Sequence, residues 1–342
     1  MNLNAAVRWA DYAGSGTIWS YKAGLDDAVT RELRLRGTYS RDVRAANLGE
    51  RFDRTGGTAN ITDKGVAGNP AYPVTIVQGG NPSVQPEKAD TVTVGAVYRP
   101  EWLPGFDVSV DWLSVSLQGS IESFSAQQIV DACYVQNNAD QCKFITRNAS
   151  DNKIFIVNQT VQNVSKAKIS GIDFEMGYTK PVDWFGGGER IGTRLFATKL
   201  TENSTTSAAG VKTDRVGETG TYALPEWKFT ANVNYTRGPL HVFVQGRYID
   251  SGKLSATNNL NGVWDVADNT VGSATYVDSR IGYDLPLASG KVQLYFNVNN
   301  LFDRAPPVAA SYSAFSAAPF QVNTNLFDQV GRRYTLGFKA DF

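Results

Sequence analysis

The chain is poor in the residues that most often carry enzyme chemistry: it has one histidine, two cysteines and two methionines among 342 residues. A Ser-His-Asp triad would have to use His241, which lies between Leu240 and Val242 in an alternating segment, so we interpret it as a structural residue. No phosphate-binding loop and no metal-ligand spacing is present. We therefore expect no active site, no cofactor and no metal, and predict that the chain is not an enzyme.

The chain also lacks an excess of charge, with 33 basic and 33 acidic side chains. A nucleic-acid partner requires a basic patch, and the balanced charge gives no reason to expect one. No run of 18 or more apolar residues is present, which excludes a membrane-spanning helix. Spanning strands stay possible, because each needs only about 9–11 residues with every second one apolar.

The first residues, 1–6, contain neither the basic region nor the apolar region of a signal peptide. Two explanations are open: an export signal has been removed, or the chain begins partway through a longer protein. We favour the second.

The dominant pattern is an alternation of apolar and polar residues, which is typical of strands with two different faces. It is clearest over 333–342, where every second residue is apolar. We count about a dozen such segments, several of them longer than the five or six residues usual in soluble sheets. They are 3–9, 19–25, 33–39, 92–98, 106–112, 172–178, 191–197, 227–235, 240–248, 277–285, 292–298 and 333–342.

The connections between these segments alternate between short and long. The short ones are 26–31, 99–105, 180–189, 237–239 and 285–290, and the long ones are 42–86, 119–165, 201–224, 251–272 and 303–330. Long loops are uncommon in compact soluble domains. Short turns on one rim and long loops on the other are typical of outer-membrane barrels. We therefore predict an all-β antiparallel transmembrane barrel rather than a soluble β-sandwich that binds carbohydrate.

Aromatic residues at or beyond the segment ends support a membrane barrel, because such rings form girdles at the lipid–water interfaces. They are Trp9, Tyr12, Trp19, Tyr39, Tyr98, Trp102, Trp184, Phe185, Trp227, Tyr248 and Tyr276. Charged residues at the polar positions are expected to face the lumen and to pair across strands. These are Arg36, Asp173, Glu175, Arg194, Arg247, Asp278 and Arg280.

Cys133 and Cys142 are the candidates for a disulfide, because an exported chain with one close cysteine pair usually joins it. Two unrelated thiols are the alternative. Before them, Ser125 is placed to cap a short helix.

Several motifs resemble the C-terminal half of a TonB-dependent receptor, in that family's order and spacing. They are Asn-Asn-Leu-Phe-Asp at 299–303 with Gly331 to Phe338, the Arg-Gly-Thr-Tyr-Ser-Arg run at 36–41, the 81–90 segment and Ser-Gly-Ile-Asp-Phe-Glu at 170–175. Ala46 departs from the proline that many relatives have there. The resemblance covers nearly all of 1–342 and implies about 12 strands of a 22-stranded barrel.

The resemblance implies a location in the outer membrane, with the long loops extracellular and the C-terminus periplasmic. It also implies that Tyr334, Phe338 and Phe342 form a C-terminal signal read by the barrel assembly machinery. The family imports scarce nutrients such as siderophores, cobalamin or oligosaccharides. The Pro-Glu-Lys-Ala-Asp segment at 86–90 and the cysteine-bearing loop resemble the subgroup often linked to carbohydrates and other non-iron substrates.

No plug domain and no TonB-engaging segment are recognisable, so the TonB complex is a partner only if the missing plug is supplied. An open sheet in lipid would leave unpaired N–H and C=O groups on two edges. Three outcomes are open: another chain supplies the missing strands, the dozen strands close on themselves, or the product never matures. A passive 12-stranded channel or structural surface barrel is therefore the alternative to a receptor fragment, and a truncated or split gene is the hypothesis we favour.

Overall fold

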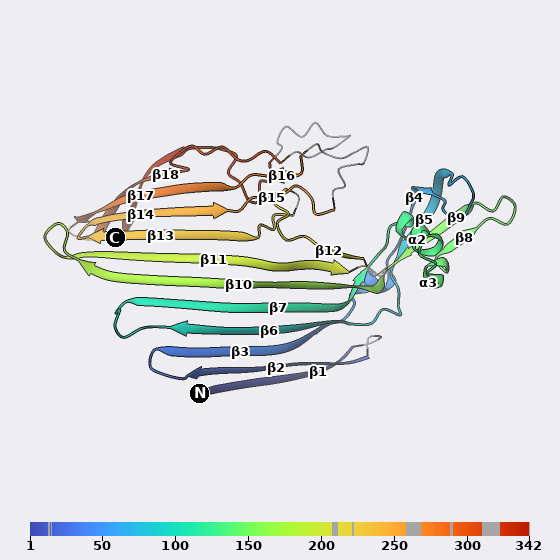
Figure 1. The fold of residues 1–342 in the computed structure, drawn as a ribbon, viewed down its shortest axis with the longest axis horizontal. Coiled ribbons are helices and arrows are strands. Elements are labelled where there is room, and N and C mark those ends of the chain that lie inside the picture. The colour runs from blue at the N-terminus through green and yellow to red at the C-terminus, as the bar shows by residue number, and fades with distance from the viewer. Residues whose placement is uncertain are drawn as a thin grey trace.

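One long antiparallel sheet makes up most of the protein (Figure 1). The computed structural model describes residues 1–12, 14, 16–206, 211–220, 222–257, 268–287, 290–309 and 322–341. The sheet order is β1-β2-β3-β6-β7-β10-β11-β13-β14-β17-β18-β19, with β12 paired to β11. The bounds are β1 Asn2–Tyr12, β2 Gly16–Ala28, β3 Leu33–Arg44, β6 Glu87–Tyr98, β7 Phe106–Glu122, β10 Gln162–Val182, β11 Glu189–Thr206, β12 Lys212–Asp214, β13 Trp227–Arg237, β14 Leu240–Ile249, β17 Ala274–Leu287, β18 Gly290–Asn299 and β19 Arg333–Asp341.

Eleven of the alternating segments lie wholly within strands of this sheet, and 333–342 matches β19. The all-β prediction is therefore confirmed. Several strands are longer than the sequence pattern indicated, and β10 reaches 21 residues. A strand rises about 3.3 Å per residue, so such strands exceed what is needed to cross a bilayer even when tilted. None of the helices in the described part of the chain is long and apolar enough to span a membrane.

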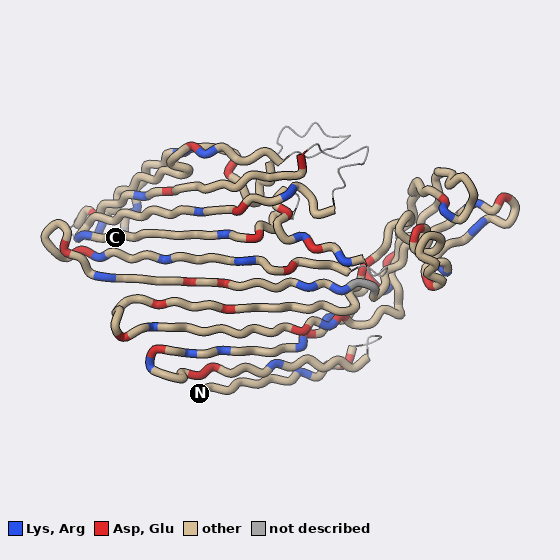
Figure 2. The backbone as a smooth tube through the Cα atoms, in the orientation of Figure 1, with Lys and Arg blue, Asp and Glu red and all other residues tan. Residues whose placement is uncertain are grey.

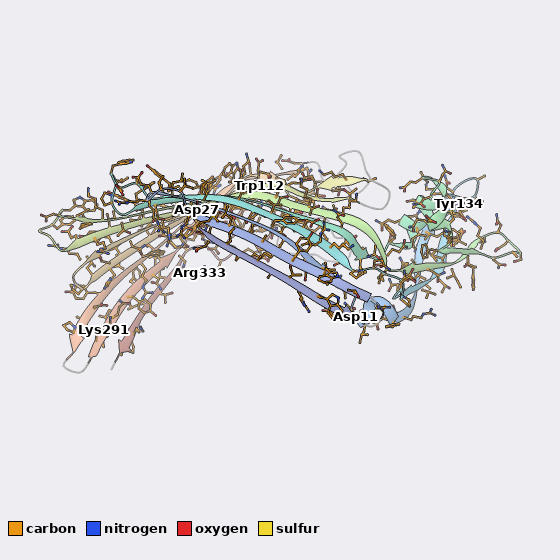
Figure 3. The ribbon with its side chains drawn as sticks, turned by 90° about the horizontal axis from the view of Figure 1, so that it is seen from below. Asp11, Asp27, Trp112, Tyr134, Lys291 and Arg333 are labelled. Atoms are coloured by element: carbon orange, nitrogen blue, oxygen red, sulfur yellow. A yellow bond between two sulfur atoms is a disulfide. The ribbon has the colours of Figure 1, made fainter. Side chains whose placement is uncertain are left out.

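The sheet is curved into an arch with a convex and a concave face (Figure 3). Trp112 lies on the convex face, in one cross-strand row with Val94 and Ile172. Val94 is 56% exposed and Trp112 is 40% exposed, because no second sheet covers this face in the described residues. A soluble sandwich would bury such a surface, and soluble monomers rarely leave large apolar patches open. The exposed apolar face contradicts the soluble-sandwich alternative.

Two aromatic residues expected at the lipid interface lie elsewhere. Tyr276 is fully buried and packs with Phe327 and Ala309 under the connection that follows β18. The register places Tyr276 opposite Arg247, on the concave face. Tyr12 also lies at a concave position of its strand, on the same face as Arg8, and its hydroxyl accepts a hydrogen bond from Arg8 at 2.9 Å. The sequence pattern missed both because closeness to a strand end does not specify the face.

The two outermost strands of the arch have one neighbour each. Among the described residues, β1 pairs only with β2 and β19 pairs only with β18. The dozen strands therefore form an open arch in this structure rather than a closed 12-stranded barrel.

The connections 42–86 and 119–165, expected as long loops, instead fold together into a second small unit, which we call the distal domain (48–81 and 123–161). It contains β4 Arg54–Thr62, β5 Ala71–Gly79, β8 Ile145–Arg147 and β9 Ile154–Thr160, with α1 Leu48–Phe52, α2 Ala126–Tyr134 and α3 Ala139–Cys142. The strand order is β4-β5-β9-β8, and β5 and β9 are parallel. Because β5 and β9 come from different connections, neither connection could form this sheet alone.

Helix α2 closes one side of the distal domain. Ser125 caps it as expected: its hydroxyl accepts from the Gln128 N–H, and the Gln128 side chain accepts from the Ser125 N–H. The buried positions Ala126, Ile129, Val130 and Cys133 follow helical spacing. The first three pack on a core that includes Ile61, Val74 and Val157. Cys133 is joined to Cys142 by a disulfide, so α3 is tied to α2.

Candidate ligand-contacting surfaces

The charged residues expected to face a lumen lie on the concave face of the arch. Asp173 stands opposite Asp111 on β7 and Thr198 on β11, and Thr198 donates a hydrogen bond to Asp173 at 2.7 Å. Arg194 Nη2 lies 2.6 Å from Glu175 Oε1, and Arg36 Nε donates to Asp111 Oδ1 at 2.7 Å. Two of these contacts join opposite charges across strands, and Asp173 is bound by a neutral hydroxyl group.

The same face continues across the later strands. Arg247 Nε lies 3.5 Å from Asp278 Oδ2, and Arg280 donates to Gln293 at 3.0 Å while stacking over the Tyr295 ring. His241 Nε2 lies 3.1 Å from Asp284 Oδ2. These contacts are structural, and no group of three or more His, Cys, Asp or Glu that could hold a metal is found in the described ranges. The described part of the concave face offers charged and polar groups that can contact a polar ligand.

A buried ion pair fixes the shape of the distal domain. Asp63 follows β4 and is fully buried, and Arg147 of β8 donates to both of its oxygens at 2.7 and 2.9 Å. The Tyr72 hydroxyl and the Gly65 N–H also donate to Asp63, at 2.6 and 2.9 Å. Burial raises the pKa of Asp63, but the hydrogen bonds from Arg147 and Tyr72 outweigh it, so the pKa lies below its usual value. The carboxylate is therefore ionised and joins the two connections.

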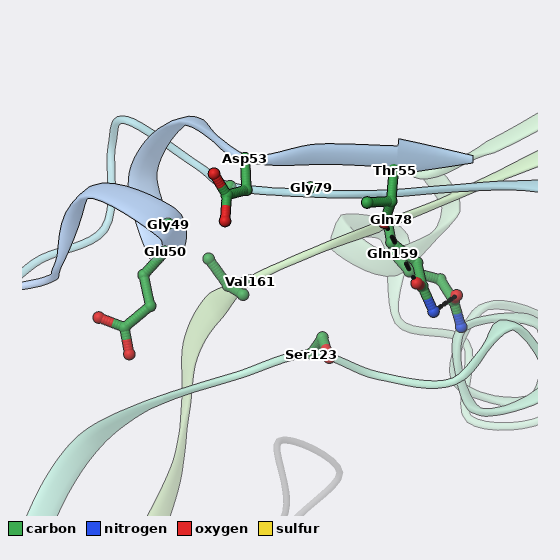
Figure 4. Close-up of a pocket in the computed structure, with 10 residues that line it drawn as sticks. Gly49, Glu50, Asp53, Thr55, Gln78, Gly79, Ser123, Gln159 and Val161 are labelled. Carbon is green, nitrogen blue, oxygen red and sulfur yellow. Dashed lines mark hydrogen bonds between the residues drawn. The ribbon is translucent and has the colours of Figure 1, made fainter. Parts of the chain in front are cut away.

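A polar pocket of about 370 Å³ lies in the distal domain, where Ser123 follows β7 and Val161 precedes β10 (Figure 4). Its wall includes Asp53, Thr55, Gln78 and Gln159, with Ser123 across from them. Gln78 donates to Gln159 at 3.1 Å, and Thr55 donates to Gln78 at 3.4 Å. The sequence analysis did not identify these residues, because ordinary polar side chains in two separate connections give no motif.

Glu50 forms a further part of this pocket, and Arg44 holds its carboxylate at 2.9 and 3.0 Å. The hydrogen bond from Arg44 lowers the pKa of Glu50. Among the described residues that line the pocket none is Lys or Arg. The lining thus offers carboxylate, amide and hydroxyl groups, which suit hydroxyl or amine groups better than an anion.

Comparison with known proteins gives the family. A family model described as "TonB dependent receptor-like, beta-barrel" matches residues 1–301. The chain belongs to this family. The interpretation drawn from the sequence motifs is therefore confirmed, as is the barrel-type antiparallel sheet.

Solved structures share the fold. The ferric enterobactin receptor of Pseudomonas aeruginosa, solved as a mutant with enterobactin, superposes with a TM-score of 0.62 at 16% identity, over 99% of this chain and 43% of that chain. The siderophore receptor PirA of Acinetobacter baumannii gives 0.60 at 14%, over 99% and 43%. The FrpB iron transporter of Neisseria meningitidis gives 0.53 at 13%, over 94% and 39%. No curated protein matches the chain.

The chain thus spans less than half the length of the receptors that it resembles. TonB-dependent receptor barrels are outer-membrane proteins with a transport role, which agrees with the expectation that this TonB-dependent receptor barrel is not an enzyme.

Proposed function

We propose that the chain is the C-terminal barrel wall of an energy-coupled outer-membrane receptor that imports a scarce nutrient. The observation that carries this proposal is the division of one sheet into an apolar convex face and an ion-paired concave face, in a chain of this family. The convex face contacts lipid and the concave face contacts water, plug or ligand. Strands from outside this sequence cover the free edges of β1 and β19, since unpaired edges do not persist in hydrocarbon.

The long connections are extracellular and the short turns periplasmic, in this proposal. The distal domain lies at one end of the strands, and the β10–β11 turn lies at the other (Figure 1). An epitope inserted at 149–152, in the β8–β9 turn, should be detected on intact cells. The same epitope at 186–188, in the β10–β11 turn, should be detected only after permeabilisation. The reverse pattern, or a chain in the soluble fraction, would contradict the proposal.

Among siderophores, cobalamin and oligosaccharides, the distal pocket favours a neutral, hydroxyl-rich nutrient. The Asp53 carboxylate would repel an anionic chelate, whereas Asp53, Thr55 and Gln78 can bind hydroxyl groups. Asp53→Ala should weaken binding of neutral oligosaccharides by about tenfold or more, because a hydrogen bond to a charged group contributes about 1.5–3 kcal/mol. Asp151→Ala, in the exposed β8–β9 turn, is the matched control. Equilibrium dialysis compares the affinities for a panel of neutral oligosaccharides and for ferric enterobactin. Preferential binding of the anionic chelate would reject this substrate class.

A further inference from the structure

The convex face changes character along its strands. On β6, the convex residues nearest the distal domain are Lys88 and Asp90, and those farther from it are Val92 and Val94. Charged residues gather at this end of the sheet (Figure 2). The change occurs at one height across neighbouring strands, since Lys88 stands opposite Gln118 and Gln118 stands opposite Lys166. A polar band therefore borders the apolar surface on its outer side.

Some cations in this band are already paired. Arg41 donates to both oxygens of Asp90, at 2.8 and 2.7 Å. Lys168 and Lys212 lie 2.7 and 2.6 Å from the two oxygens of Glu202. Asp90 and Glu202 are thus both occupied by neighbouring cations.

Lys88 and Lys166 differ from these cations, because both are exposed and neither has an ion pair among the described residues. The cross-strand partners of Lys88 are Val43 and Gln118, and those of Lys166 are Gln118 and Thr206, all uncharged. Their strands lie two spacings apart, or about 10 Å. Two extended ammonium groups can converge on one anionic group over that distance.

A pocket of about 310 Å³ opens beside Lys88. The β2–β3 pairing ends at Tyr21↔Arg41, whereas the β3–β6 pairing continues to Arg44↔Glu87. Strands β2 and β3 therefore separate beyond this point and leave a gap between them. The residues that line the gap include Trp19, Tyr21, Arg41, Val43, Pro86 and Lys88. Aromatic and apolar groups therefore stand beside the unpaired ammonium of Lys88.

We propose that this place on the convex face binds the phosphate-bearing headgroup of an outer-leaflet lipid. Lys88 and Lys166 hold the phosphate oxygens, and Trp19 and Tyr21 contact the apolar part of the same molecule. The combination of unpaired cations with an amphipathic pocket on the lipid side favours a lipid over a free anion. The inference rests on the proposed function, since it needs the distal domain to be extracellular.

The test uses the full chain extracted from outer membranes in mild detergent, with diphosphoryl lipid A as the probe and native mass spectrometry as the readout. Lys88→Gln and Lys166→Gln should each weaken binding about fivefold, because a basic residue near an anionic lipid surface contributes a factor of this order. Lys228→Gln is the matched control. Lys228 is an exposed lysine opposite Thr198 on the concave face, and its removal should leave binding unchanged.

Three results would overturn the proposal. One is binding of the probe by the double variant Lys88→Gln/Lys166→Gln with the affinity of the native chain. Another is binding of dephosphorylated lipid A as tightly as diphosphoryl lipid A. Displacement of the probe by millimolar inorganic phosphate would assign the site to the free ion instead. Far-ultraviolet circular dichroism of each variant confirms that the strands are intact. A chain absent from the outer-membrane fraction contradicts the proposed function itself, and this is seen before any lipid is added.

Discussion

Arg36 and Asp111 are joined by two hydrogen bonds although their strands, β3 and β7, are not neighbours. Gly95 of β6 lies between them and stands opposite both residues. A Cβ at this position would clash with the Asp111 carboxylate. The absence of a side chain at Gly95 therefore lets the two charges meet across a strand.

Gly95→Ala should lower the free energy of unfolding by about 1 kcal/mol, because it forces Asp111 away from Arg36 and the pair is partly exposed. Gly246→Ala is the matched control on β14, where a Cβ meets open space. That control should be neutral or slightly stabilising. Urea unfolding of both variants in detergent measures the difference, and equal midpoints would show that the Arg36–Asp111 pair contributes nothing.

The Asp63–Arg147 pair makes the distal domain sensitive to acid. Because the pKa of Asp63 is lowered in the folded state, its stabilisation is present above the unfolded-state pKa of about 3.9. It is lost as the pH falls through the lower folded-state pKa. Amide hydrogen exchange over 54–79 should therefore accelerate as the pH falls below about 4, after correction for intrinsic rates.

Asp63→Asn should destabilise the distal domain by about 3–5 kcal/mol at neutral pH, because Arg147 would be left without its buried partner. The variant should also lose most of the acid sensitivity. Asp140→Asn removes an exposed carboxylate that pairs with Lys143 in the same domain, and it serves as the control. If the acid sensitivity persists in Asp63→Asn, a titratable group other than Asp63 causes it.

The disulfide should stabilise the distal domain and leave the arch unaffected. Cys133 and Cys142 are nine positions apart, and closing a loop of this size contributes about 2–3 kcal/mol in the chain-entropy model. Reduction, or Cys142→Ala, should raise proteolysis within 126–144. Thermal unfolding of the strands in detergent should not change, and a large shift there would mean that the two units unfold together.

The C-terminal assembly signal stays a proposal, and the fold shows only where two of its three residues lie. Tyr334 and Phe338 lie on the convex face and are 62% and 71% exposed, whereas Phe342 lies outside the described residues. Phe338→Ser or deletion of Phe342 should lower the amount of chain in the outer-membrane fraction several-fold. Thr335→Ala changes an exposed concave residue of the same strand and should have little effect. Equal amounts for all variants would contradict a signal role.

The sequence by itself determined the strands and their two faces. Alternation at period two is a local property, so the segment around Trp112 could be recognised as a strand with one apolar side without knowledge of its neighbours. The helix cap at Ser125 and the Cys133–Cys142 pair were likewise readable, because each depends on residues close together in the chain.

Only the tertiary structure decided which distant segments meet. The parallel β5–β9 pair, the Asp63–Arg147 contact and the gap beside Tyr21 each join segments from separate connections or strands. The sequence pattern predicts loops in the long connections, because their polar residues carry no strong period. Their order comes from a core that neither connection can bury alone, and such cooperative burial has no signature in either segment.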